Sequence, residues 1–438
     1  MKITYYTAAV VSVEVDGLKI LCDPWLYPGA FYGSWYHYPP FEFDPEEFSD
    51  IDYIYISHTH EDHLCAKSME ALNKDIPVLI HKFKSPFVKK IVERMGFNVI
   101  EIPHGERYNL TDNVHFKVFS SQESSESDEG KQTAIDTYCL INDGKHTFVN
   151  TNDNFIENIE SELHKIKEEY GDIDFLANVY TSASCYPQTT LSLSGDELEK
   201  EKNRVTKWCY DRSATLIKAL NPKYYMPFAG FYLLSGKLSH LNNKRVNSCP
   251  YEAKQYFEEN YPYSLKNNKC IVLNRGESFD IKDGSQSKEY IHYSYEEKQK
   301  YIDDFLSNIK FDYEKKDPIQ DPIGETHSFL EDCYTRMEKH RKRLDFSTDT
   351  SVYIKIDSDN YIYVSMNGGG CYFVDKKHLL NSDKYVTMEM DLRLLVDILK
   401  GPRYAHWDNA DTGSHISYTK KPNIHEKGIY HVICYFHS

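Results

Sequence analysis

The chain has 438 residues, of which 40% are hydrophobic and 27% charged, and its formal net charge at pH 7 is −16. This length exceeds one ordinary domain and predicts two or three compact units. The negative charge argues against a nucleic-acid backbone or an anionic membrane as the default partner, although a local basic pocket for an anionic small molecule is compatible with it.

The first 150 residues predict strands that alternate with helices. The pair Asp16–Gly17 between two apolar runs predicts a tight hairpin. Apolar residues at helical spacing predict helices over 67–73 and 85–95. Strands are expected over residues 2–6, 10–15, 18–22, 51–56, 78–80, 98–102, 114–119, 137–141 and 146–150. This alternation predicts helices packed over sheets.

Residues 120–131 are polar and acidic, which predicts a mobile loop or a lid. Beyond residue 150 the patterns predict helices over 155–170 and 195–220, a helical connector over 291–345 and a second unit over 346–438. The second unit should contain strands over 351–356, 361–366, 371–374 and 431–436 and a helix over 392–399. Residues 1–290 are then the expected catalytic domain.

The sequence carries no signal for a membrane or an oxidising compartment. It has no apolar run of 18 residues, and residues 1–4 do not begin the apolar region of a signal peptide. The ten cysteines include no C-x-x-C pair, which favours reduced thiols. We therefore expect a cytoplasmic protein without a membrane anchor.

The most informative stretch is Ser57–Leu64, which reads Ser-His-Thr-His-Glu-Asp-His-Leu directly after a predicted strand. Imidazole and carboxylate side chains are the ligands of catalytic zinc, iron and manganese. His58 and His60 point the same way in an extended segment, and a turn at Asp62–His63 would redirect those two side chains to a neighbouring position. The alternative is a solvated loop, but the full pattern favours two adjacent metal positions.

A pair of adjacent cations requires an anion between them, because two dications otherwise repel strongly. Asp153 is the candidate, since it follows the predicted strand over 146–150 and would lie at the same sheet edge as His58. The alternative is a turn aspartate that binds its own backbone.

The H-x-H-x-D-H spacing of His58, His60, Asp62 and His63 resembles the signature of the metallo-β-lactamase superfamily. Three further stretches resemble the branch of that superfamily that includes CMP-N-acetylneuraminate hydroxylase: Asn150–Asp153, Pro227–Gly230 and, more loosely, residues 406–415. The resemblance implies an α/β fold, an αββα sandwich with a smaller C-terminal α+β domain.

The same resemblance implies the roles of individual residues. His58 and His60 would hold one metal, Asp62 and His63 the other, and Asp153 would bridge the two or serve the second. One departure is that hydrolytic members carry another histidine about thirty residues before the bridging aspartate, where this chain has Ser120–Glu123.

Other histidines are weaker candidates for the missing ligands. His104 and His115 are the nearest upstream imidazoles, and both are better interpreted as strand-end residues. His240 is the histidine available after the long helix to close the site. In the tail, His406 and His415 could form a second site or contact the first site from above. The favoured alternative is an aromatic, hydrogen-bonded turn that packs the C-terminal domain on the catalytic one.

The first functional hypothesis is a metallohydrolase that acts on a small, anionic substrate. One or two divalent metals, zinc first and iron or manganese as alternatives, would lower the pKa of bound water. Asp62 or Asp153 would orient that water or carry its proton. Asp23 would hold a ligating histidine by its free ring nitrogen.

Two alternatives remain open. An iron-dependent oxygenase or oxidase could use the same residues, but a Rieske cluster needs a C-x-H and C-x-x-H pair and the sequence contains no C-x-H stretch. A separate electron-transfer protein would then be required. The other alternative is a non-catalytic binding module with a degenerate metal site.

Overall fold

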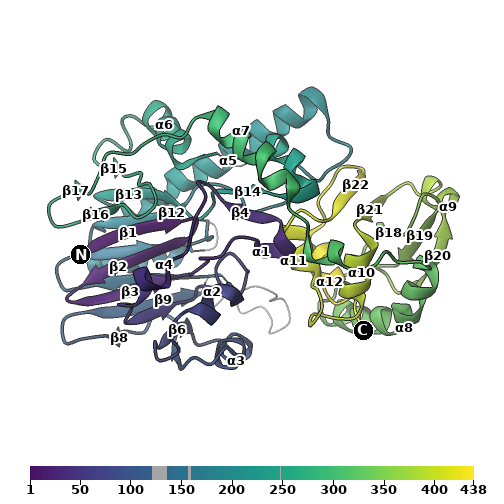
Figure 1. Ribbon diagram of the computed structural model, residues 1–438, viewed down its shortest axis with the longest axis horizontal. Helices are drawn as coiled ribbons and strands as arrows, with labels where there is room; N and C mark the ends of the chain where they lie inside the picture. The colour runs from purple at the N-terminus through teal and green to yellow at the C-terminus, as the bar shows by residue number, and fades with distance from the viewer. Residues whose placement is uncertain (121–135, 156–158, 247) are drawn as a thin grey trace.

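The computed structural model describes residues 1–120, 136–155, 159–246 and 248–438 (Figure 1). The loop predicted over 120–131 therefore lies, apart from Ser120, outside the described residues. Two large β-sheets face each other, and a smaller sheet with its own helices lies beside them, at the right of Figure 1.

The first sheet has eight strands in the order β17-β16-β1-β2-β3-β5-β6-β7. Strands β1 to β3 are antiparallel neighbours, whereas β3, β5, β6 and β7 are parallel, so these four end at one edge. The strands are β1 (Lys2–Thr7), β2 (Val10–Val15), β3 (Leu18–Cys22), β5 (Tyr53–Tyr55), β6 (Val78–His81), β7 (Val99–Ile102), β16 (Ser278–Asp280) and β17 (Ser285–Gln286).

The second sheet has seven strands in the order β15-β13-β12-β11-β10-β9-β8. The strands predicted over 137–141 and 146–150 are present as β10 and β11, which form a hairpin with Cys139 opposite Asn150. The strands are β8 (Tyr108–Asn109), β9 (His115–Ser120), β10 (Thr137–Asn142), β11 (Thr147–Asn150), β12 (Phe175–Val179), β13 (Tyr224–Phe228) and β15 (Lys269–Cys270).

Burial of apolar side chains holds four layers together. Val11 and Val13 of the first sheet meet Phe116 and Phe148 of the second in the central core. Helices α2 (Ala66–Ala71) and α3 (Phe87–Arg94) cover the outer face of the first sheet, and α4 (Glu160–Tyr170), α5 (Gly195–Leu220) and α6 (Pro250–Asn260) cover that of the second. The expected αββα sandwich is confirmed.

The C-terminal α+β domain is also confirmed. Its sheet has the order β20-β19-β18-β21-β22, and α8 and α10 bury Met337 and Leu395 against it. The elements of this part are α7 (Tyr295–Asp304), α8 (Pro322–Arg343), β18 (Ser351–Lys355), β19 (Asn360–Val364), β20 (Cys371–Asp375), α9 (Lys376–Leu380), β21 (Tyr385–Glu389), α10 (Leu392–Leu399), α11 (Trp407–Thr412), β22 (Ser417–Lys421) and α12 (Lys427–Ile433).

The strand predicted over 431–436 is wrong, because this segment begins inside helix α12. Ile429, Val432, Ile433 and Phe436 are buried at spacings of three, four and seven residues, which is the spacing of one helical face. The sequence predicted a strand here, but the packing of this face against the C-terminal core selects a helix. The sheet edge is instead formed by β22, which pairs with β21.

Short elements connect the sandwich to the C-terminal domain. Strand β4 (Trp35–His37) pairs with β14 (Tyr232–Leu234), and α1 (Ala30–Gly33) precedes this pair. The 3₁₀ helix η1 (Pro45–Phe48) follows β4, and η3 (Gly236–Lys244), η4 (Leu306–Asn308) and η5 (Asp312–Lys315) lie between β14 and α8.

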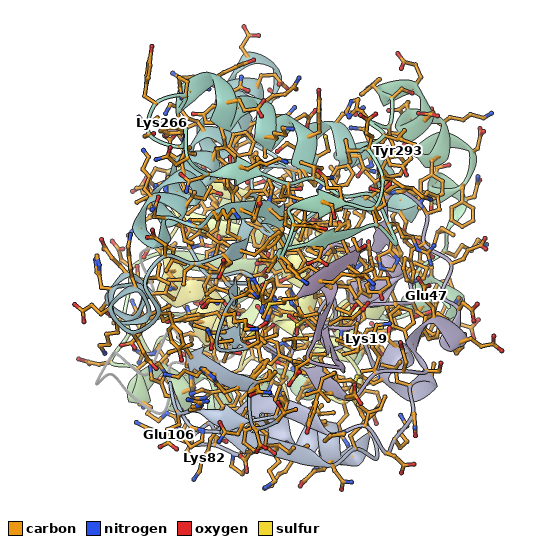
Figure 2. All side chains as sticks on the ribbon, turned by 90° about the vertical axis from the view of Figure 1, so that its left-hand side faces the viewer. Lys19, Glu47, Lys82, Glu106, Lys266 and Tyr293 are labelled. Atoms are coloured by element: carbon orange, nitrogen blue, oxygen red, sulfur yellow. The ribbon has the colours of Figure 1, made fainter. Side chains whose placement is uncertain are left out.

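Charged side chains lie on the outside of the sandwich. Figure 2 views the end away from the C-terminal domain, where Lys82, Glu106 and Lys266 project from the periphery and are exposed. In the part of the chain that the structure describes, no helix has both the length and the apolar surface required to cross a bilayer.

Gly236 provides a test of the contact between β14 and the connector. Its φ is +54°, and an added Cβ would lie 2.7 Å from the Ile309 carbonyl oxygen and 2.9 Å from the Phe311 ring. We expect Gly236→Ala to lower the free energy of unfolding by about 2–4 kcal/mol in chemical denaturation. Gly144→Ala is the control, because Gly144 also has a positive φ but its Cβ would contact nothing within 4 Å. Equal losses in the two variants would contradict the proposed clash.

Candidate metal centre

The signature residues follow strand β5 at the edge where the parallel strands of the first sheet end. The chain turns back after His60, since the backbone amides of His63 and Leu64 both donate to the His60 carbonyl oxygen, at 3.0 and 2.8 Å. The segment after β3 lies alongside, because the Asp23 amide donates to the Tyr55 carbonyl oxygen at 2.9 Å. The predicted strand and turn thus place the signature next to Asp23.

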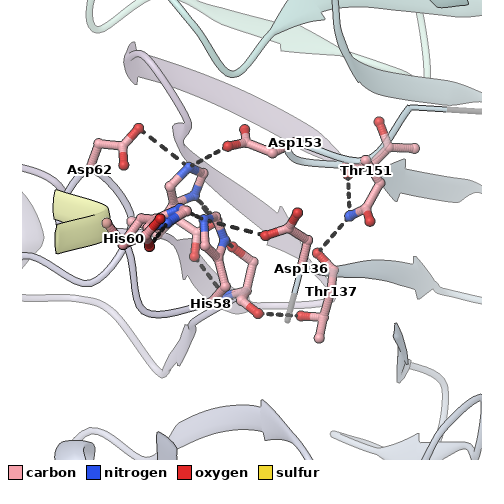
Figure 3. Close-up of polar contacts among 12 residues, drawn as sticks. His58, His60, Asp62, Asp136, Thr137, Thr151 and Asp153 are labelled. Carbon is pink, nitrogen blue, oxygen red and sulfur yellow. Dashed lines mark hydrogen bonds and ion pairs between the residues drawn. The ribbon is translucent and has the colours of Figure 1, made fainter. Parts of the chain in front are cut away.

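The first group of candidate ligands consists of His58, His60 and Asp136. The Nε2 atom of His58 lies 2.9 Å from Nδ1 of His60 and 3.6 Å from Oδ1 of Asp136. One ligand atom from each residue lies within 4.8 Å of the other two. Figure 3 shows the Asp136 carboxylate directed toward these imidazoles from the neighbouring sheet.

The second group consists of His58, His63 and Asp153, again with ligand atoms within 4.8 Å of one another. Nε2 of His63 is 3.5 Å from Oδ2 of Asp153 and 3.5 Å from Oδ2 of Asp62, so two carboxylates converge on one imidazole (Figure 3). His58 belongs to both groups, which makes them adjacent positions of one centre.

Asp23 organises the centre from behind. It is fully buried and accepts hydrogen bonds from the Ser57 amide at 2.7 Å and from the Ser57 hydroxyl at 2.8 Å. Its Oδ2 atom also lies 3.0 Å from Nδ1 of His63. This contact leaves Nε2 of His63 directed toward Asp62 and Asp153, as expected for a histidine that binds a metal through Nε2.

A contact between the two sheets holds Asp136 in place. The hydroxyl of Thr137, the first residue of β10, donates to the Ser57 carbonyl oxygen at 2.6 Å and lies 2.8 Å from the Tyr55 hydroxyl. The Asn154 amide group donates to the Thr137 carbonyl oxygen at 3.3 Å. Asp136 therefore lies close to the signature because its neighbour Thr137 belongs to the second sheet and is hydrogen-bonded to residues of the first.

The electrostatics of the centre suit a cation. Desolvation, together with the positive charges of His63 and His60, lowers the pKa of His58 well below its usual value. Desolvation and the nearby Asp153 charge raise the pKa of Asp136 to about 6. Burial also opposes the charge of Asp153, but the contact with His63 outweighs it and lowers the Asp153 pKa. Imidazoles and carboxylates held this closely form a donor set that fits one or two divalent metals.

The structure brings together His58, His60, Asp62, His63 and Asp153 but not His240. His240 is exposed on η3, and its Nδ1 atom lies 2.8 Å from the Lys237 carbonyl oxygen of the same turn. It belongs to neither group of candidate ligands among the described residues. The exposed ring of His240 lies on a short surface helix and does not reach the sheet edge. His240 therefore does not provide the predicted closing ligand.

The upstream histidines also stay apart from the centre. His104 accepts a hydrogen bond from the Ser120 amide at 3.1 Å, and His115 lies 2.8 Å from the Tyr170 hydroxyl. Asp136 was missed because the prediction sought an imidazole about thirty residues before Asp153. Its position directly before the predicted strand over 137–141 was the signal that could have identified it.

The tail is a packing element that also reaches the centre. His415 bonds through Nε2 to the Phe31 carbonyl oxygen at 2.7 Å and through Nδ1 to the Tyr313 hydroxyl at 2.9 Å, so it links segments instead of forming a second site. Oδ2 of Asp408 lies 3.0 Å from Nε2 of His60. Burial lowers the pKa of His60, but the Asp408 contact outweighs burial and raises this pKa to about 9.

Comparison with known families identifies the domain that carries this centre. Residues 2–156 match the family model described as a beta-lactamase superfamily domain. These residues are a beta-lactamase superfamily domain. The matched range contains the whole signature, Asp136 and Asp153, so the superfamily domain includes both groups of candidate ligands.

Curated relatives match about half of the chain. The cytidine monophosphate-N-acetylneuraminic acid hydroxylase of Danio rerio is 28% identical over 244 residues, which are 52% of this chain and 38% of the relative. A protein of Mycobacterium tuberculosis described as a Rieske 2Fe-2S iron-sulfur protein is 26% identical over 252 residues, 56% of this chain and 46% of the relative. The chain thus covers less than half the length of these relatives.

Solved structures with a more distant likeness include two enzymes. The isothiocyanate hydrolase from Delia radicum gut bacteria has a TM-score of 0.43 and 15% identity, over 64% of this chain and 98% of the other. CmlA, a diiron beta-hydroxylase from Streptomyces venezuelae, has a TM-score of 0.40 and 17% identity, over 63% of this chain and 53% of the other.

Proposed function

We propose that this chain is a metal-dependent enzyme that acts on a small molecule at the metal centre formed around His58. Two groups of side chains support the proposal, because each offers three ligand atoms within 4.8 Å and the two groups share one imidazole. The residues that would hold one or two metals are His58, His60, Asp62, His63, Asp136 and Asp153.

The observation that favours one chemistry is the carboxylate of Asp136 in the first group. With His58 and His60 it makes a set of two histidines and one carboxylate, which is the donor set of non-haem iron(II) oxygenases. We therefore propose an iron-dependent oxygenase. The named activity of the hydroxylase relatives agrees with this choice.

In this proposal bound iron would supply the oxygen chemistry, and the protein would supply ligands, orientation and protons. Asp23 fixes the ring of His63, and Asp62 and Asp153 place carboxylate oxygens 3.5 Å from its Nε2 atom, where they can hold a proton beside the reacting groups. Residues 1–438 contain no C-x-H stretch for a Rieske cluster, so electrons would reach the centre from a redox group outside these residues, such as that of an electron-transfer protein.

A hydrolase that uses zinc or manganese is the second candidate. It is favoured by the adjacency of the two groups, since two neighbouring dications activate water and stabilise a leaving oxygen. Asp62 or Asp153 would then orient the water or accept its proton. A small anionic substrate suits either candidate, because a metal centre attracts negative groups.

Metal content and turnover separate the candidates. Protein purified without chelator should contain iron and consume oxygen in the presence of a chemical reductant and a suitable substrate. Zinc or manganese together with turnover of ester or phosphoester probes would support the hydrolase instead. A non-catalytic binding module would be indicated if His58→Ala and Asp153→Ala variants fold normally and keep the cellular function.

The role of Asp136 gives a direct prediction. Replacing it with histidine converts the first group to three imidazoles, the set found in carbonic anhydrase-type zinc sites. We expect Asp136→His to lower the iron-to-zinc ratio at least tenfold, measured by elemental analysis of proteins made in the same medium. Asp112→His, at an exposed position, is the control. An unchanged ratio in Asp136→His would remove the main support for iron.

A further inference from the structure

Helix α11 of the C-terminal domain contacts the signature through two neighbouring pairs of side chains. Asp408 Oδ2 lies 3.0 Å from His60 Nε2, and the Asn409 side-chain amide donates to Glu61 Oε1 at 2.9 Å. The other oxygen of Glu61 accepts from the Phe31 amide at 2.5 Å. Two consecutive residues of the signature thus meet two consecutive residues of α11.

The contact of Asp408 is with a ring nitrogen that the metal would not use. His60 directs Nδ1 to the first group, where this atom lies 2.9 Å from His58 Nε2, and directs Nε2 away to Asp408. A carboxylate on the second nitrogen of a ligating histidine fixes the tautomer and the ring orientation and makes the ligand more basic.

His63 has the equivalent arrangement with the opposite ring atoms. Its Nδ1 atom contacts Asp23, which belongs to the superfamily domain, and its Nε2 atom faces the second group. Each position of the centre therefore has one histidine backed by a carboxylate. For His63 the carboxylate comes from within the sandwich, and for His60 it comes from the C-terminal domain.

Helix α11 is held firmly enough to orient a ligand. Trp407 is buried and donates from Nε1 to the Phe436 carbonyl oxygen at 2.8 Å. Asp411 accepts hydrogen bonds from the Cys185 thiol at 3.0 Å and from the Tyr418 hydroxyl at 2.5 Å. These bonds fix the helix at Trp407 and at Asp411, which lie before and after Asp408. The backbone of Asp408 is therefore held in position.

We propose that Asp408 is a positioning residue for the metal ligand His60, so that the C-terminal domain completes the metal centre of the superfamily domain. The proposal rests on the proposed metal centre and extends it. It assigns the tail a role in metal binding, in addition to its role in packing the domains together.

The test uses the full-length protein and measures metal affinity by competition with a chromophoric chelator. For Asp408→Ala we expect metal binding at the first group to weaken about 10–100-fold, the usual effect of losing such an outer partner, while the second group keeps its affinity. Asp408→Asn keeps the shape but not the charge, and should lie between Asp408→Ala and the wild type. In a titration with cobalt, the absorption band of the ion bound at the first group should weaken in the variant. The band of the ion bound at the second group should stay as in the wild type.

Asp143→Asn is the matched control, because Asp143 also contacts a histidine, with Oδ2 3.2 Å from His146 Nδ1 in the β10–β11 hairpin. It should bind metal like the wild type. If Asp408→Ala does not fold, the isosteric Asp408→Asn variant carries the test. Wild-type affinity in a folded Asp408→Asn or Asp408→Ala protein at both positions overturns the role of Asp408. A wild-type protein that binds no metal overturns the proposed function itself.

Discussion

Replacement of His58 with alanine is expected to weaken metal binding at the centre strongly. His58 is the residue that belongs to both groups of candidate ligands, and its ring is buried between the other imidazoles. One imidazole nitrogen binds one ion, and Nδ1 of His58 already lies 3.0 Å from the Ser57 hydroxyl oxygen. The loss of His58 therefore removes a ligand from the position that its Nε2 atom occupies, and we expect the affinity for that ion to fall at least a hundredfold. Elemental analysis after gel filtration, together with chelator competition, measures this loss.

His240→Ala is the natural control for that experiment. The sequence made His240 a candidate ligand, but the structure places its exposed ring in η3, bonded to its own turn. We expect His240→Ala to keep the wild-type metal content and activity. Loss of metal in this variant, with His58→Ala unaffected, would show that the centre lies elsewhere.

Removal of the Asp23 carboxylate is expected to cost both stability and metal. Asp23 is completely buried and bonds the amide and hydroxyl of Ser57 and the ring of His63. Alanine would leave these buried donors without their acceptor, which destabilises proteins by about 3–5 kcal/mol. Chemical denaturation of the metal-free protein should report this loss, and the second metal position should bind more weakly because His63 can then rotate.

Asp23→Asn separates the two effects. The amide keeps the volume and one acceptor oxygen, so the loss of unfolding free energy should be smaller than in Asp23→Ala. Its metal affinity at the second position should nevertheless fall, because a neutral group no longer supports the His63 ring. Wild-type stability of Asp23→Ala in the absence of metal would contradict this role of Asp23.

The parts of the site that lie in continuous patterns could be predicted from the sequence. The strand before Ser57 and the turn at Asp62–His63 follow from local hydrophobic and turn signals, and the structure reproduces both. Asp153 was predicted to lie at the sheet edge of His58 because it follows a recognisable strand, and the structure brings it close to His58. In each case neighbours along the chain determine where the side chain lies.

The parts that depend on tertiary contacts could not be predicted. Asp136 reaches His58 because Thr137 bonds to Ser57 in the other sheet, and no local pattern encodes this pairing. The histidine after the long helix was the predicted closing ligand, but the conformation of η3 leaves His240 exposed. The same limit explains the error over 431–436, where packing on the C-terminal core selects helix α12 over a strand.

The contact between His60 and Asp408 joins residues that are 348 positions apart in the sequence. During synthesis, domains emerge from the ribosome and fold from the N-terminal side first. The sandwich, whose last strand along the chain is β17 (Ser285–Gln286), is therefore synthesised before Asp408 can reach it. An ion bound to the nascent chain would exchange more readily, because Asp408 does not yet support the His60 ligand. The metal found in the purified protein would then be the one that the complete chain binds most tightly.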